Sequence, residues 1–346
     1  MAKTLEVNHT SARDFVVRAN LLELDEDARM VGLPLEEPAP VRPFAHGQLS
    51  DFTKIPKRYY DRMLVDDPSL LATNVNHWLS EKDDARMIRT LDGEARAVVS
   101  QKFRPLDNYE LGTIVLEQLT SLGAEVVSTA LTETRFYLKA VNPNLELPVI
   151  GSKRIGDVVR SGICISNSEV GNGALKIEEW DLVLFCLNGQ ASHSTFRRHH
   201  VGDKYELDAK VRELLSDETK EKRDEAFWMT VRDVVKAAFD ETSFRARVDR
   251  MSATTANAIE SNDFPAVVEV TRETLGLSSE LQDGILGHLV RGGDLTQWGL
   301  VNAVTRMAED VESYDLSMKL ERAGGKLIEL EPRAWEKITQ AELAIA

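Results

Sequence analysis

The chain of 346 residues is long enough for about two domains of ordinary size and for a well-buried core. Hydrophobic residues make up 42% of it, but no apolar run approaches the roughly 18 residues that a membrane span needs, so a membrane partner is not expected. The formal net charge of −15 argues against a chain coated with phosphate-binding side chains, although much of the acidic excess lies in residues 206–346, which hold 28 acidic and 18 basic side chains.

The N-terminal part of the sequence predicts an arm followed by a small helical unit. Residues 1–45 are expected to form an arm or linker, because the prolines of EEPAPVRPF interrupt any helix. The opening MAKTLEVNHTSARDF lacks the apolar core of a secretion signal, which favours a cytoplasmic location in a bacterial host cell. Residues 46–82 predict short helices, with Pro56 in a first turn and Asp67-Pro68 ending one helix and starting the next.

Strand-like periods dominate residues 83–205. ARMIRTL and EARAVVSQ flank Asp92-Gly93, which is typical of a tight hairpin because glycine accepts a positive φ. LDNYELGTIVLEQLTSL has helical spacing, and Asp107 or Asn108 is available to cap it. GICISNSEVGNGALKIEEWDLVLFCLNG predicts two further strands around a polar turn. The segment therefore predicts an α+β unit with a central antiparallel meandering sheet and a packed helix.

Residues 206–346 predict a mostly helical region. KVRELLSDETKEKRDEAFWMTVRDVVKAAFDET favours a long amphipathic helix, and LTQWGLVNAVT favours a later helix started by Asp294 or Thr296. In that later helix Trp298 and Asn302 lie one turn apart, which indicates packing and a buried amide hydrogen bond. The fold class expected for the whole chain is α+β, with the central sheet flanked by the small N-terminal helical unit and this helical region.

Three separated blocks resemble a known family. These blocks are similar to the phage and plasmid proteins grouped as domain of unknown function 932. They are IPKRYYDRM with NVNHWL, then RAVVSQKFRPLDNYEL, then the long GICISNSEVGNG block. The tail DLTQWGLVNAVTRMAEDVESYDLSMKLERAGGKLIEL is similar to that family as well. The resemblance implies an accessory protein of a mobile element, often encoded near replication or recombination functions. It implies nucleic acid as a partner by association only. A helix-flanked antiparallel sheet is also similar to the plan of single-strand annealing proteins, which favours single-stranded DNA and a homo-oligomer.

Basic and aromatic side chains of the central unit supply the candidate nucleic-acid contacts. They are Arg86, Arg96, Lys102, Phe103, Arg104, Lys153, Arg154, Arg160, Arg197, Arg198, His199 and His200. On a strand, Lys102 and Arg104 would share a face for phosphate while Phe103, with Tyr109 and Phe136, would stack on bases. The alternative is that these are solvated residues paired with nearby acids.

Glu169 in the turn NSEVGNG and the cluster HSTFRRHH permit a second interpretation. Glu169, His193 and His199 are possible metal ligands, although no HxH or HExxH spacing is present. A salt bridge from Glu169 to Arg160 or Arg197 is the structural alternative. Alternative functions are thus a metal-dependent phosphodiester or nucleotide hydrolase, and an acidic interaction or inhibitor protein that binds a host factor. Catalysis is not favoured and no cofactor is expected. Cys164 and Cys186 are expected to be reduced core residues.

Overall fold

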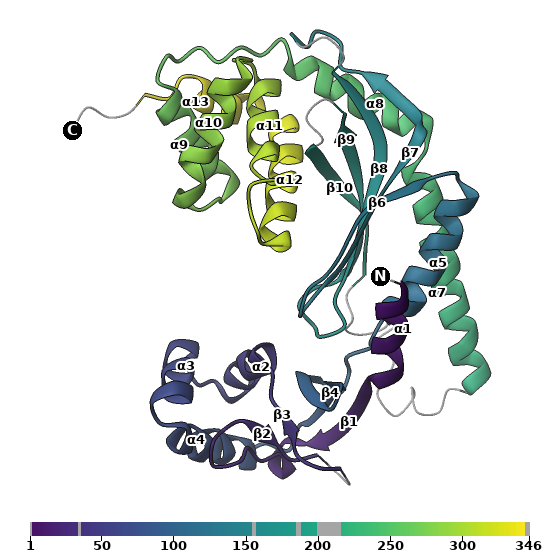
Figure 1. Ribbon diagram of the computed structural model, residues 1–346, viewed down its shortest axis with the longest axis vertical. Coiled ribbons are helices and arrows are strands. Elements are labelled where there is room, and N and C mark those ends of the chain that lie inside the picture. Colours follow the sequence, from purple (N-terminus) through teal and green to yellow (C-terminus); the bar gives the residue numbers. More distant parts are fainter. Residues whose placement is uncertain (1, 34–35, 154–156, 185–187, 199–215, 343–346) are drawn as a thin grey trace.

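The computed structural model describes residues 2–33, 36–153, 157–184, 188–198 and 216–342. Figure 1 shows a long twisted sheet at the centre, with helices on both of its faces and a separate N-terminal lobe at one end. The predicted α+β class, with a large antiparallel sheet and a mostly helical C-terminal region, is confirmed. None of the described helices is both long and apolar enough to cross a membrane.

The N-terminal lobe holds a three-stranded sheet, a two-stranded sheet and three α-helices among the described residues. Its elements are β1 (Arg13–Arg18), η1 (Ala19–Leu21), β2 (Met30–Val31), β3 (Ala39–Pro40), α2 (Pro43–Thr53), α3 (Lys57–Asp66), α4 (Pro68–Ser80), β4 (Ala85–Leu91) and β5 (Glu94–Ser100). Strand β1 pairs with β4 in antiparallel register, with Arg13 opposite Thr90. Residues expected in a loose arm therefore form an edge strand instead, and the boundary expected near residue 83 falls inside this lobe.

Local chemistry explains how the lobe begins and ends its elements. Asp92 and Gly93 both have positive φ, 55° and 79°, as a two-residue hairpin between β4 and β5 requires. Asp67 accepts a hydrogen bond from the Leu70 amide at 3.1 Å and so caps α4, directly before Pro68. The predicted hairpin and the predicted helix start at Asp67-Pro68 are confirmed.

The central sheet is antiparallel throughout, in the order β10-β9-β8-β7-β6. Its strands are β6 (Glu125–Leu131), β7 (Phe136–Pro148), β8 (Val158–Asn167), β9 (Leu175–Val183) and β10 (Asn188–Arg198). Strands β8 and β9 are the pair expected around NSEVGNG. Strands β4 and β5 do not join this sheet, so the single meander expected for residues 83–205 is corrected to two separate sheets.

Helices cover one face of the sheet along its length. They are α5 (Asn108–Ser121), α7 (Asp217–Ala238) and α8 (Glu241–Thr254), and α1 (Ala2–Ser11) packs against α5. Buried Leu138 and Ile163 point to this face and pack with Leu111 of α5 and Val231 of α7. Asp107 caps α5 by accepting from the Tyr109 amide at 2.8 Å, as predicted. The long helix predicted from residue 210 is described from Asp217 onward, and its earlier residues lie outside the described chain.

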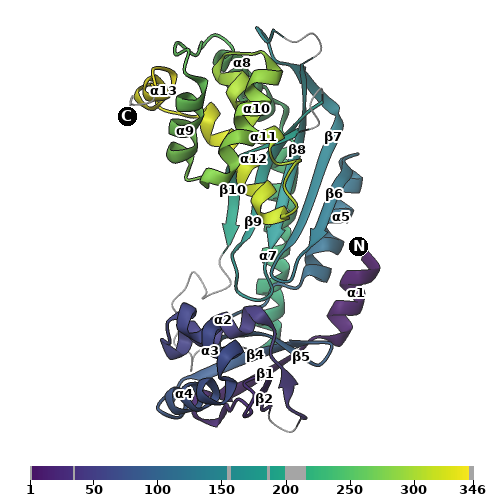
Figure 2. The same cartoon turned by 60° about the vertical axis from the view of Figure 1, so that its left-hand side comes forward.

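The opposite face is covered by the C-terminal helices (Figure 2). They are α9 (Phe264–Leu275), η2 (Ser279–Leu281), α10 (Gln282–Gly292), α11 (Gln297–Arg306), α12 (Tyr314–Ile328) and α13 (Pro332–Thr339). Thr296 caps α11, Trp298 is fully buried, and the Asn302 amide donates to the Trp298 carbonyl at 3.0 Å. The packing and the amide bond predicted for this helix are confirmed. Cys164 is a free, buried thiol, as expected, and Cys186 lies outside the described residues.

Candidate functional site

The polar turn between β8 and β9 joins the central sheet to the N-terminal lobe. Glu169 accepts from the Asn108 amide at 2.7 Å and pairs with Arg96 of β5 at 3.0 Å, while Arg89 of β4 donates to its carbonyl. Gln48 of α2 donates to the Val170 carbonyl at 2.8 Å. Glu169 is only 9% exposed, and each of its carboxylate oxygens already has a partner. The expected pairing of Glu169 with Arg160 or Arg197 is corrected to Arg96.

Burial removes several sequence candidates from any surface site. Arg96 is 6% exposed and paired with Glu169, so it does not present a charge to a phosphate. Phe103 is 6% exposed and packs with Val99 and Val170, so the expected base stacking by Phe103 is corrected to core packing. Phe136 is buried as well.

The segment after β5 is a turn rather than a strand. The Phe103 amide donates to the Ser100 carbonyl, so the alternation expected for Lys102 and Arg104 does not apply. Lys102 is exposed, and Arg104 forms an ion pair with Asp224 of α7.

The other predicted cations are spread over both ends of the sheet. Arg160, near the start of β8, donates to Glu146 at 2.8 Å, and Lys153 lies 3.9 Å from Asp294. Arg197 and Arg198 end β10 at the opposite end of the sheet, beside the first residues of β9, and the Arg198 guanidinium lies 4.1 Å from the centroid of the Phe227 ring. Arg154, His199 and His200 lie outside the described residues. The predicted residues therefore do not form one shared patch.

The metal alternative has no support from the described part of the chain. No group of three or more His, Cys, Asp or Glu side chains there is placed to hold a metal ion. Glu169 is occupied by Arg96 and Asn108, while the side chains of His193 and His199 lie outside the described set. The expected role of Glu169 as a ligand is corrected to that of a link between the lobe and the sheet.

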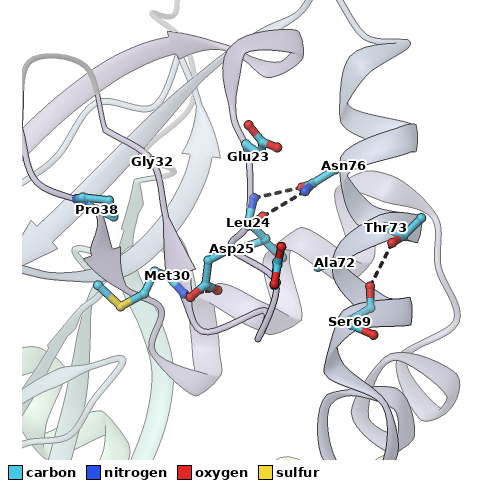
Figure 3. A pocket seen from close by; sticks show the side chains of 11 residues that line it. Glu23, Leu24, Asp25, Met30, Gly32, Pro38, Ser69, Ala72, Thr73 and Asn76 are labelled. Carbon is cyan, nitrogen blue, oxygen red and sulfur yellow. Dashed lines mark hydrogen bonds between the residues drawn. The ribbon is translucent and has the colours of Figure 1, made fainter.

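A hollow of about 680 Å³ lies between the β2 segment and α4 (Figure 3). Glu23, Asp25 and Glu26 line it, so its charge repels phosphate. The Asn76 side chain accepts from the Leu24 amide at 2.8 Å and donates to the Leu24 carbonyl at 2.9 Å. It thereby satisfies both backbone groups of Leu24, as a neighbouring strand would. This hollow is a structural feature of the lobe.

A second surface of the same lobe combines rings and cations. We call it the aromatic–lysine surface, and it consists of Phe52, Lys54, Tyr59, Trp78, Lys82 and Arg86. Tyr59 of α3 and Trp78 of α4 are 41% and 47% exposed, which leaves ring area open for stacking. The Asn74 amide lies 3.5 Å from the Tyr59 hydroxyl and belongs to the same wall.

Two adjoining hollows make up this surface. The first, of about 440 Å³, is lined by Phe52 and Arg86, and the second, of about 470 Å³, by Tyr59 and Trp78. Lys54 and Lys82 line both hollows. The described residues that line the second hollow include no acidic side chain, whereas Asp51 and Asp84 line the first. On a chain of net charge −15, the second hollow is locally cationic.

The cations of this surface are held in place by the Phe52 ring, in the case of Arg86 and Lys82, and by the end of helix α2, in the case of Lys54. The Arg86 guanidinium carbon lies 3.6 Å from the centroid of the Phe52 ring, and the Lys82 ammonium 4.9 Å from it. Lys54 ends α2 in the left-handed conformation, with φ 61°, where a glycine is the usual residue. The left-handed backbone is strained for a lysine, and a glycine would end the helix without that strain.

Only Arg86 of this surface was among the sequence candidates. Tyr59 and Trp78 lie in the blocks IPKRYYDRM and NVNHWL, which carry the family resemblance, and Phe52 lies just before the first block. One signal was present: Leu70 and Trp78 lie eight residues apart on α4, close to two helical turns, so both fall on the same solvent-facing side of that helix.

Comparison with protein-family models, with curated proteins and with solved structures finds no match to this chain. The fold defines the class of the chain as an α+β protein with a separate N-terminal lobe.

Proposed function

We propose that the protein binds single-stranded nucleic acid through the aromatic–lysine surface, as an accessory protein of a phage or plasmid that acts in DNA recombination or replication. The observation that carries the proposal is the pair of exposed rings, Tyr59 and Trp78, beside Lys54 and Lys82 on a strongly anionic chain. The sequence resemblance supports the mobile-element setting.

The geometry favours unpaired bases over a duplex. A base that is free of pairing stacks on the Tyr59 or Trp78 ring, and the lysines contact the adjoining phosphates. The guanidinium plane of Arg86, held on Phe52, offers a second stacking surface in the neighbouring hollow. Bases inside a duplex are stacked on each other, so they do not reach these rings.

Fluorescence anisotropy with labelled oligonucleotides tests the proposal. We expect the protein to bind single strands more tightly than duplexes of equal length, and binding to weaken as salt rises. Trp78→Ala should weaken single-strand binding about tenfold, because one stacking contact is lost. Leu70→Ala is the matched control, since Leu70 is exposed on the same helix but lines neither hollow. Equal binding by Trp78→Ala and wild type would reject this surface as the site.

Lys54→Gly separates function from stability. Glycine accepts the left-handed backbone at this helix end, so the variant should be as stable as wild type or up to about 1 kcal/mol more stable. Loss of the ammonium should nevertheless weaken oligonucleotide binding and flatten its salt dependence by about 0.7 in log–log slope. Urea unfolding and anisotropy on the same preparation measure both. Unchanged affinity in Lys54→Gly would remove Lys54 from the site.

An annealing-like role further requires several copies of the chain on one strand. Light scattering after size-exclusion chromatography, with and without a long single strand, measures this. A monomer under both conditions would contradict the oligomeric part of the proposal while leaving strand binding intact.

A further inference from the structure

A row of polar side chains crosses the central sheet at the end nearest the N-terminal lobe. Tyr137 of β7 pairs with Ser166 of β8, Ser166 with Lys176 of β9, and Lys176 with Arg197 of β10. Directly paired residues share one face of a sheet, and Tyr137 packs with Met318 on the face that α12 covers. The row therefore lies on the face opposite α7.

Like charges meet in this row. Lys176 and Arg197 are direct cross-strand partners, an arrangement that ordinarily destabilises a sheet. Arg197 is exposed and Lys176 half-buried, and within the described part of the chain neither has an acidic partner. Burial, and then the charges of Arg322, Arg197 and Arg135, lower the pKa of Lys176 against the opposing effect of Glu178.

Neighbouring acids are engaged elsewhere. Glu178 accepts from the Arg322 guanidinium at 2.8 Å, and Asp315 accepts from the Tyr137 hydroxyl and lies 3.9 Å from Arg135. The Ser166 hydroxyl is fully buried and has no hydrogen-bond partner among the residues that the structure describes. A buried hydroxyl without a partner costs free energy, so this row contains a hydrogen-bonding group that the described residues leave unsatisfied.

We propose that Lys176 and Arg197, next to Ser166 in the row, form a phosphate-binding site, to which Arg135, a donor to the Asn172 carbonyl, adds positive charge. A phosphate group supplies the negative charge that the paired cations lack, and its oxygens accept hydrogen bonds from both side chains. The site is distinct from the aromatic–lysine surface, because none of its residues lines either hollow. It does not depend on the proposed function, since a free phosphate-bearing molecule and a polynucleotide present the same group.

Thermal unfolding in inorganic phosphate, against chloride at equal ionic strength, tests the site. We expect phosphate to raise the melting temperature of the wild type, because a ligand that binds only the folded state stabilises it. Lys176→Met and Arg197→Gln should lose this response yet melt at the wild-type temperature or higher in chloride, since cation repulsion is removed. Arg197→Gln changes an exposed residue and is the variant expected to fold without difficulty. Arg232→Gln, which alters an α7 cation paired with Glu117, should respond like wild type.

No phosphate response in the wild type, or an equal response in Lys176→Met and Arg197→Gln, would overturn the site. A second arm identifies the source of the phosphate. If the two variants also bind a single-stranded oligonucleotide at least about tenfold more weakly, the polynucleotide occupies the site. If only the response to inorganic phosphate is lost, the site takes a free phosphate compound. A phosphate response that persists in Trp78→Ala, while strand binding is lost, shows that the two sites are separate.

Discussion

His46 of α2 is a titratable residue in the core of the N-terminal lobe. Its ring nitrogen Nδ1 lies 2.9 Å from the hydroxyl of Tyr60, and both residues are buried. Burial, and then the charge of Lys57, lower the pKa of His46 to about 4. The folded protein thus holds the imidazole neutral at pH values where the unfolded chain, with a pKa near 6.5, protonates it.

A pH dependence of stability follows from this residue. Between about pH 6.5 and pH 4 the unfolded state binds more protons than the folded state, so the free energy of unfolding falls as the pH falls. The loss from pH 6.5 to pH 5 should be about 2 kcal/mol. Urea unfolding of wild type and His46→Gln across this range measures it, and the difference between the two proteins should shrink or reverse toward pH 5. Parallel pH profiles of the two proteins would contradict this assignment.

At the scale of single elements, α12 binds the sheet through charged as well as apolar contacts. Lys139 of β7 donates to Glu321 of α12 at 2.8 Å, and the Trp180 indole donates to the same carboxylate at 3.1 Å. Both charged residues are buried, and burial raises the pKa of Glu321 against the opposing charge of Lys139. The pair fixes the position of α12 along β7, since neither charge has water to replace its partner.

The two partners of this pair should be energetically coupled. Lys139→Met leaves the Glu321 carboxylate buried without its cation, and we expect a loss of about 3 kcal/mol in the free energy of unfolding. In Lys139→Met/Glu321→Gln the buried charge is gone while Trp180 keeps an acceptor, so the loss should be smaller than the sum of the two single changes. Guanidinium unfolding of the four proteins measures the coupling, and additive losses would contradict it.

Elements set by neighbouring residues were predictable from the sequence. The hairpin at Asp92-Gly93 and the caps at Asp67, Asp107 and Thr296 depend on dihedrals and hydrogen bonds within a few residues. Contacts between distant segments were not predictable, because apolar alternation fixes the face of a strand but not its partner.

The candidate site was predicted only in part for the same reason. Arg13 and Thr90 are 77 residues apart, and nothing near either residue indicates that β1 pairs with β4. The partner of Glu169 and the approach of α3 to Lys82 depend equally on tertiary packing. Arg86 alone of the predicted contacts belongs to the aromatic–lysine surface.

At the scale of the whole molecule, hairpin tips of the central sheet hold the N-terminal lobe. The β8–β9 turn supplies Glu169 and Val170, and the β6–β7 turn supplies Glu133, which accepts from the Phe44 amide at 3.4 Å. Val170 packs with Val99 and Phe103 of the lobe side. The buried pair of Arg96 and Glu169 is the charged centre of this junction.

Glu169→Ala should loosen the junction. It leaves the Arg96 guanidinium buried without its carboxylate, and we expect about 3 kcal/mol less stability together with a larger radius of gyration in solution X-ray scattering. The control is Glu146→Ala, which removes a partly exposed partner of Arg160 within the sheet and should cost no more than about 1 kcal/mol. A Glu169→Ala protein with wild-type scattering and stability would show that apolar packing alone holds the lobe.

The N-terminal lobe is built from one continuous stretch of chain, since all of its strands and its own core lie before residue 101. During synthesis this stretch leaves the ribosome before the central sheet does, and domains generally fold in that order. Arg96 is therefore made well before residue 169, and in the nascent lobe it stays hydrated until the β8–β9 turn emerges. Closure of the lobe onto the sheet therefore has to wait until the β8–β9 turn has been synthesised.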